Sequence, residues 1–154
     1  MQTVILAIHN ILRWAIVLFA VWTLWNALTG VISKRKYTGN DNRASLFFMI
    51  FCDLQLLIGL FLYFNYGWFT KLKNLADYKA IPAERFFIIE HMAMMILAWL
   101  LVHLGRTMVK KGNTDRAKHL RSLLFFGLAI ALILAAIPWP VREAIARPWW
   151  RSFS

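Results

Sequence analysis

The sequence predicts an all-α integral membrane protein, a single domain of residues 1–154 built as a bundle of four transmembrane helices. Of the 154 residues, 60% are hydrophobic, and the mean hydropathy is positive. That is more apolar surface than one soluble core of this size needs. The apolar residues gather in four runs, and a helix needs about 20 such residues to cross the hydrocarbon of a bilayer. Most of the charged residues lie between the runs.

The four predicted spans comprise residues 4–32, 45–66, 86–105 and 121–139. The first is longer than the hydrocarbon is thick, so we expect it to tilt or to begin in the interface. This span starts without charge and is followed by a basic cluster, whereas a cleaved signal peptide has its positively charged region before the apolar run. We therefore expect it to be retained. The tail places Trp139, Trp149 and Trp150 among Pro and Arg, which predicts a short interfacial C-terminal segment.

The distribution of Lys and Arg predicts the orientation. The segments after the first and third spans hold ten cations: Lys34, Arg35, Lys36, Arg43, Arg106, Lys110, Lys111, Arg116, Lys118 and Arg121. The connection 66–85 and the tail hold seven over a longer stretch, and no cation precedes the first span. We expect both short basic segments to be cytoplasmic, with the N- and C-termini outside.

Two histidines form the sharpest pattern inside the spans. Counted from the predicted outer ends at about 1.5 Å per residue, His9 and His91 lie at the same depth on parallel helices. A six-coordinate haem b needs such a pair, because its axial nitrogens approach iron from opposite faces of the porphyrin. The sequence predicts His9 and His91 as haem iron ligands in a pocket whose further candidates are Phe86, Phe87, Met92, Met94, Met95, Gly59 and Gly127. The alternative is that each histidine is only an interfacial anchor.

The other ionisable residues of the spans need partners, because a charge in hydrocarbon costs roughly 2.5–3.5 kcal/mol. Arg13 lies one turn after His9, so we expect it to hold a haem propionate or to pair with Asp53 or Glu90. The alternative is that it only extends toward the interface and needs no partner. With Gln55, these two acids form a candidate polar cluster. Asp53 serves either as a clamp on Arg13 or as a protonatable ligand-binding group.

The remaining histidines are not predicted as ligands. His103 follows His91 by 12 residues, which places it about 120° around the helix. We expect His103 and His119 to be polar residues at helix ends beside Arg106 and Lys118.

Composition excludes several classes of function. The net charge is +11, and most basic residues lie at the ends of the apolar runs, where they can anchor helices beside anionic lipid. This pattern argues against nucleic-acid binding, which needs a basic face exposed to water. The single cysteine, Cys52, lies in an apolar run and permits neither an intrachain disulfide nor a zinc or iron–sulfur site of its own.

Four strings in the chain carry a resemblance: HNILRW (9–14), DLQLLIGLFLYF (53–64), RFFIIEHMAMM (85–95) and AAIPWP (135–140). Together they resemble a family of small four-span membrane proteins of Bacteroidota that are commonly labelled cytochrome b or hypothetical membrane protein. The resemblance implies a multi-pass protein of the bacterial inner membrane, with His9, Arg13, Gln55, Glu90 and His91 as recurring polar positions. The chain departs from the family at Asp53, where relatives often have His, which leaves His9 and His91 as the ligand pair.

These observations predict a haem b-binding electron-transfer or quinone-linked redox subunit, with the lipid bilayer, a quinone and other membrane subunits as partners. Whether the protein is an enzyme stays open, because any catalysis would depend on a partner. The alternative is a haem-free accessory subunit of a larger inner-membrane complex. A small transporter fits less well, because the chain shows no inverted repeat and no paired broken helices.

Overall fold

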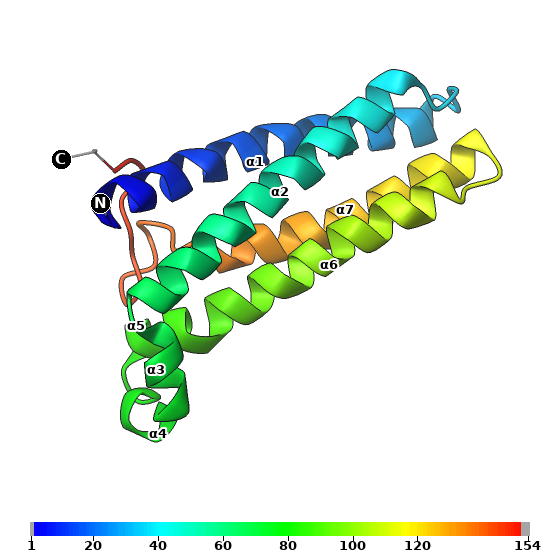
Figure 1. The fold of residues 1–154 in the computed structure, drawn as a ribbon. Coiled ribbons are helices and arrows are strands. Elements are labelled where there is room, and N and C mark those ends of the chain that lie inside the picture. Colours follow the sequence, from blue (N-terminus) through cyan, green and yellow to red (C-terminus); the bar gives the residue numbers. More distant parts are fainter. Residues whose placement is uncertain (1, 152–154) are drawn as a thin grey trace.

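The computed structural model describes residues 2–151, and these residues form helices joined by turns and loops (Figure 1). Four helices are long and apolar enough to cross a membrane, which confirms the predicted four-helix membrane bundle. They contain α1 (Gln2–Ile32), α2 (Gly39–Asn65), α6 (His91–Lys110) and α7 (Asp115–Ala136). Three short helices, α3 (Trp68–Lys73), α4 (Leu75–Tyr78) and α5 (Pro82–Arg85), precede a π-helical turn, η1 (Phe86–Glu90), that runs into α6.

The observed helix limits differ from the predicted spans where capping chemistry decides them. α2 begins at Gly39 because Thr38 and Asp41 form a capping box, and α7 begins at Asp115 because Thr114 Oγ1 accepts the backbone N–H of Ala117. α7 ends at Ala136, before 139, because the residue ahead of Pro138 takes an extended conformation.

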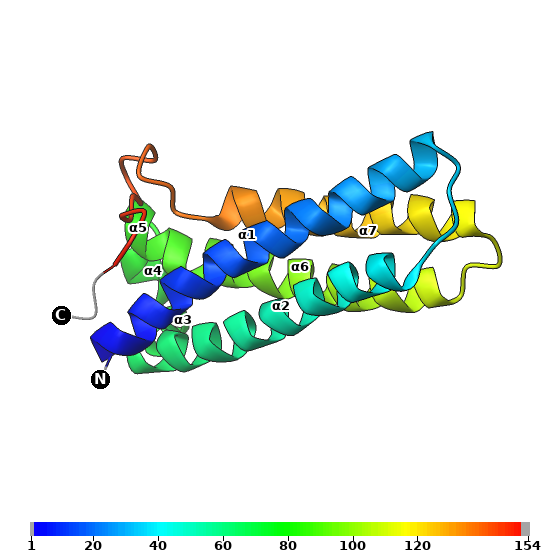
Figure 2. The same cartoon turned by 90° about the horizontal axis from the view of Figure 1, so that it is seen from above.

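The four long helices alternate in direction (Figures 1 and 2). Successive long helices pack against each other, α1 with α2, α2 with α6 and α6 with α7, and α1 also packs against α7. Contacts between α2 and α6 are the sparsest of these four interfaces. We name the two ends by their contents. The loop end contains the connections 33–38 and 111–114; the cavity end contains the start of α1, helices α3–α5 and the C-terminal segment, residues 137–151.

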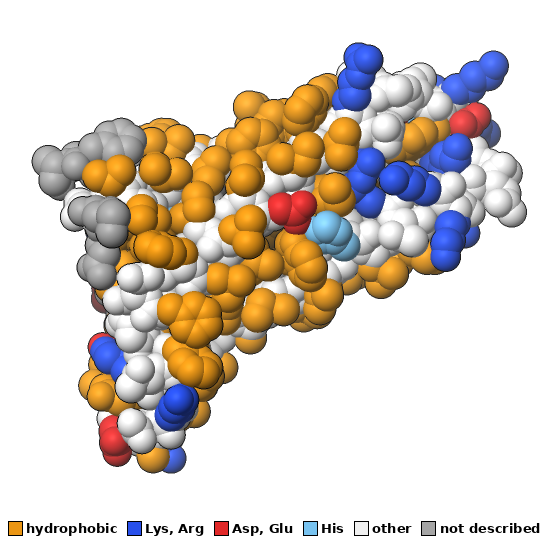
Figure 3. Space-filling model, viewed as in Figure 1, with side chains coloured by type: hydrophobic (Ala, Val, Ile, Leu, Met, Phe, Trp, Pro, Cys, Tyr) orange, Lys and Arg blue, Asp and Glu red, His pale blue; other side chains and the backbone are white. Residues whose placement is uncertain are grey.

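The bundle interior combines large aromatic side chains with small residues. Phe48 and Phe126 are fully buried and meet edge to face. Ala20, Ala98 and Ala129 are buried beside them, and small residues let membrane helices approach closely. The outer surface is apolar along most of its length, whereas Lys and Arg side chains gather toward the loop end (Figure 3). This arrangement is compatible with a surrounding bilayer.

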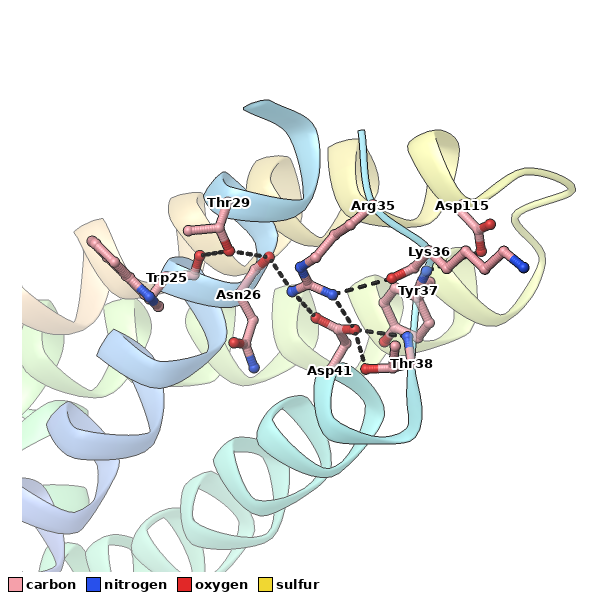
Figure 4. A network of polar contacts seen from close by, with 9 residues as sticks. All are labelled: Trp25, Asn26, Thr29, Arg35, Lys36, Tyr37, Thr38, Asp41 and Asp115. Carbon is pink, nitrogen blue, oxygen red and sulfur yellow. Dashed lines mark hydrogen bonds and ion pairs between the residues drawn. The ribbon is translucent and has the colours of Figure 1, made fainter. Parts of the chain in front are cut away.

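A polar network closes the loop end (Figure 4). The guanidinium of Arg35 donates to both carboxylate oxygens of Asp41, at 2.8 and 2.6 Å, and to the carbonyl of Asn26 at 2.9 Å. Asp41 also accepts from the backbone N–H of Thr38 at 2.7 Å. The hydrogen bond to Asp41 raises the pKa of Arg35, so the guanidinium stays charged. The network ties the end of α1 to the start of α2.

Candidate functional site: a cavity lined by two histidines

A cavity of about 420 Å³ lies between α1, α2 and α6 at the cavity end of the bundle. Its walls include His9 and Arg13 from α1, Gln55 and Gly59 from α2, and His91 from α6. Residues of the C-terminal segment also line it. The sequence-predicted ligand pair, His9 and His91, is therefore brought to one cavity from two different helices.

His91 is oriented by a backbone carbonyl. Its Nδ1 lies 2.9 Å from the carbonyl oxygen of Ala136, the last residue of α7. A carbonyl has no proton to give, so Nδ1 carries the proton and Nε2 keeps its lone pair. Histidine ligands of metals are commonly fixed in this way by a second hydrogen bond. The same contact gives a partner to a carbonyl that the end of the helix would leave unpaired.

The π-helical turn η1 immediately precedes His91, and it sets the register at which the chain enters α6. The hydroxyl of Tyr63 on α2 donates to the carbonyl of Ile88 within this turn at 2.8 Å. Single π-helical turns inside α-helices are frequent at functional sites. Periodicity cannot reveal one, because the sequence pattern assumes a regular helix.

His9 is held differently. Its backbone carbonyl accepts a hydrogen bond from Nε2 of Gln55 at 3.0 Å, while its own Nδ1 is buried without a partner. The imidazole lies against Gly59, where an added Cβ would come within 3.2 Å of the ring carbon Cε1. Glycine at this position leaves the space that the ring occupies.

Three residues of the cavity wall carry buried polar atoms that lack a hydrogen-bond partner: His9 Nδ1, Arg13 Nε and Gln55 Oε1. Buried polar groups in native proteins are nearly always satisfied, and each exception requires an explanation. All three residues line one cavity, so a ligand bound there could supply the missing hydrogen-bond partners.

Positive charge gathers on the same walls. Arg13, Arg147 and Arg151 all line the cavity, and no Asp or Glu is among the described lining residues. Burial, and the neighbouring charge of Arg151, lower the pKa of Arg147. An anionic group in the cavity would relieve this crowding of like charges.

The predicted ion pairs of Arg13 are wrong. Its Nη2 donates to the carbonyl of Trp149 at 2.8 Å, and its guanidinium lies over the rings of Trp14 and Trp139. Glu90 instead accepts from Arg85 at 2.8 Å, so the predicted cluster of Asp53, Gln55 and Glu90 does not form.

Asp53 forms the contact that the sequence did not predict. Its Oδ1 accepts the indole N–H of Trp99 at 2.6 Å and lies 2.8 Å from Nε2 of His103. His103 is also not at the helix end predicted for it, because α6 continues to Lys110; Arg106, one turn later on α6, donates to Ser45 and to Asn42. The sequence shows that Asp53 and His103 are polar residues of two different spans, but their positions along the helices did not identify them as a pair.

Only some of the other residues predicted for the haem pocket line the cavity. Phe87, Met92, Met95 and Gly59 line the cavity, whereas Phe86, Met94 and Gly127 are not among its lining residues. His119 lies near the start of α7, as predicted, and is fully buried there against Gly30 and beside the ring of Tyr37.

Among residues 2–151, no group of three or more His, Cys, Asp or Glu side chains gathers to hold a bare metal ion. A haem iron needs only two such ligands from the protein. No family model, no curated protein and no solved structure matches the chain.

Proposed function

We propose that this protein binds one haem b between His9 and His91 and serves as an electron-transfer or quinone-linked redox subunit of the bacterial inner membrane. One observation carries the proposal: two histidines from separate helices line one cavity, and the carbonyl of Ala136 fixes His91 in the tautomer that leaves Nε2 unprotonated.

The residues present fit this group. A haem is a flat apolar ring with two carboxylates, and the cavity has largely apolar walls with three arginines on its lining. Its volume of about 420 Å³ is within the range of roughly 300–1,000 Å³ that small-molecule and cofactor pockets occupy. The partnerless Nδ1 of His9 and the space beside Gly59 give that imidazole room to adjust toward a ligand.

Each wall of the cavity has its own part. His91 presents Nε2 in a fixed orientation, while Arg13 and Arg147 supply positive charge for the carboxylates. The ring of Trp150, in the C-terminal segment, stacks on the ring of Trp14 and so fastens this segment to α1 beside the cavity. When bound, haem b supplies a one-electron carrier whose potential is tuned by its axial ligands and burial.

The proposal also places the cavity near the outer leaflet. The basic residues of the loop end are those that the positive-inside rule puts in the cytoplasm, and the cavity lies at the opposite end of the bundle. Electrons would then be exchanged with a periplasmic donor or with a quinone in the membrane.

The test is a reduced-minus-oxidised visible spectrum of protein expressed with haem supplied and purified in mild detergent. We expect the bands of a b-type haem at one equivalent per chain. We expect His9→Ala and His91→Ala each to abolish those bands, because each removes one axial ligand. His103→Ala is the matched control, since His103 bonds to Asp53 and is not among the residues lining the cavity.

A second variant separates loss of the ligand from loss of the fold. His91→Met keeps a side chain able to ligate iron and should retain haem with shifted bands. Protein that is folded but colourless, or a spectrum that survives His9→Ala, would overturn the proposal and favour a haem-free accessory subunit.

A further inference from the structure

The contact between Asp53 and His103 is partly exposed on the membrane-facing surface of the bundle. The two side chains are 35% and 37% exposed. Figure 3 shows acidic and histidine side chains side by side, midway along a largely hydrophobic face. Asp53 lies about 20 Å from either end of α2 at 1.5 Å per residue. Ionisable residues at such depth almost always face the bundle interior, so one on the outer surface is a candidate functional site.

The hydrogen bonds within the cluster determine which of its polar atoms remain free to bind a ligand. Oδ1 of Asp53 accepts from both Trp99 and His103, and Oδ2 has no hydrogen-bond partner among the described residues. A neutral His103 that donates through Nε2 keeps a lone pair on Nδ1. The cluster therefore presents two hydrogen-bond acceptors, and a ligand that complements it brings hydroxyl donors.

The depth of the cluster limits where the ligand comes from. A molecule that reaches Asp53 from the bilayer must dissolve in hydrocarbon, which charged phospholipid headgroups do not. The side chains one turn from the cluster, Ile50, Leu57 and Leu100, are apolar and exposed. They form a surface suited to an isoprenoid or alkyl tail beside a polar ring.

Trp99 joins this surface to the cavity. Its indole N–H donates to Asp53 at 2.6 Å, and its ring, tilted by 50° to that of His103 with 4.4 Å between the centroids, also lines the cavity. The outward-facing acceptors and the cavity that we assign to haem are thus separated by a single aromatic side chain.

We propose that Asp53, His103 and Trp99 form a binding site, open to the bilayer, for the hydroxyl-bearing ring of a lipid-soluble quinol. A redox role for this site rests on the proposed function, because electrons from the quinol would need the haem as acceptor. Binding of the quinol depends only on Asp53, His103 and Trp99. Because both free groups are acceptors, the site distinguishes the reduced from the oxidised ring: a quinol donates two hydrogen bonds, whereas a quinone can only accept them.

The experiment measures binding of a decyl-benzoquinol, and of the corresponding quinone, to the protein in quinone-free phosphatidylcholine nanodiscs, with empty nanodiscs as the blank. The wild-type protein should bind the quinol at least about tenfold more tightly than the quinone, the factor expected for a hydrogen bond to a charged acceptor. Asp53→Asn replaces the free Oδ2 by an N–H donor. It should weaken quinol binding about tenfold and shift the preference toward the quinone.

Two controls separate this site from the fold and from the haem cavity. Asp77→Asn makes the same chemical change on α4 and should leave both affinities unchanged. His9→Ala should abolish the haem spectrum and leave quinol binding intact, so failure at one site is distinguishable from failure at the other.

Three results would overturn the inference. The first is wild-type protein that binds neither ring above the blank. The second is a folded Asp53→Asn protein whose preference for the quinol is unchanged. The third is ligand-free wild-type protein that light scattering shows to be a dimer, dissociated by Asp53→Asn, because a second copy would then cover the cluster.

Discussion

The two ends of the bundle use polar residues in opposite ways. At the loop end, Arg35 and Asp41 satisfy each other, and Arg106 donates to Ser45 at 2.8 Å. At the cavity end, His9, Arg13 and Gln55 each keep a buried polar atom without a partner. A satisfied polar group within an apolar bundle stabilises the fold, whereas several unsatisfied ones around one cavity indicate a ligand.

His119 and Asn26 limit that rule. Nδ2 of Asn26, near the end of α1, is buried without a partner, and so are both ring nitrogens of His119, which is fully buried at the same end. The ring of His119 occupies the space beside Gly30, so closely that a side chain at Gly30 would collide with it. Neither His119 nor Asn26 is among the described residues that line the cavity. Unsatisfied atoms that line no common cavity are therefore weaker evidence of a ligand than the grouping around His9.

The largest effect that we expect on stability is at the loop end. Asp41→Ala removes the bidentate partner of Arg35 and the capping box of α2. Loss of a buried ion-pair partner costs about 3–5 kcal/mol, and because Arg35 is one-third exposed we expect about 2–3 kcal/mol here. Thermal unfolding followed by circular dichroism measures it.

Asp115→Ala is the control, because the side chain of Asp115 makes a single exposed hydrogen bond within residues 2–151, from the backbone N–H of Tyr37 at 3.0 Å. The haem content of the Asp41→Ala protein that remains folded should equal that of the wild type. A large loss of haem in this variant would mean that the two ends do not have separate roles.

The next effect is on the C-terminal segment. Arg13→Gln removes the hydrogen bond to the Trp149 carbonyl and the contacts with the rings of Trp14 and Trp139. We expect the segment to detach more readily by about 2 kcal/mol, the loss typical of a hydrogen bond to a charged group. Trypsin cleavage after Arg142 should become faster, as mass spectrometry would detect, whereas Arg116→Gln should leave the rate unchanged.

A smaller effect is expected at the π-helical turn. Tyr63→Phe removes the donor to the Ile88 carbonyl and should cost about 1 kcal/mol, the usual value for one hydrogen bond. Because this turn leads into His91, the haem bands should also broaden or shift. An unchanged spectrum together with lowered stability would assign Tyr63 to folding alone.

The smallest effect is expected beside His9. Gly59→Ala places a methyl group about 3.2 Å from the His9 ring and should weaken haem binding a few-fold, since the ring must move by a few tenths of an ångström. Gly127→Ala is the matched control, because its nearest neighbour, Leu24, lies at 4.0 Å. Haem titration of the two apoproteins compares them, and equal affinities would show that Gly59 does not shape the site.

The membrane bundle and the meeting of His9 with His91 at one cavity followed from the sequence. Apolar run length determines how many helices can span a bilayer, and equal offsets along parallel helices place two residues at equal depth. These are one-dimensional properties of the chain, and they survive errors of several residues in the helix limits.

Only the tertiary structure decided which polar side chains pair. Arg13 and Asp53 carry opposite charges, yet Arg13 contacts the Trp149 carbonyl and Asp53 contacts His103. A partner depends on the rotation of each helix about its axis and on the path of the C-terminal segment, and both are set by side-chain packing. The π-helical turn before His91 shifts that rotation further. Depth can be counted along a sequence, whereas the direction in which a side chain points exists only once the helices have packed.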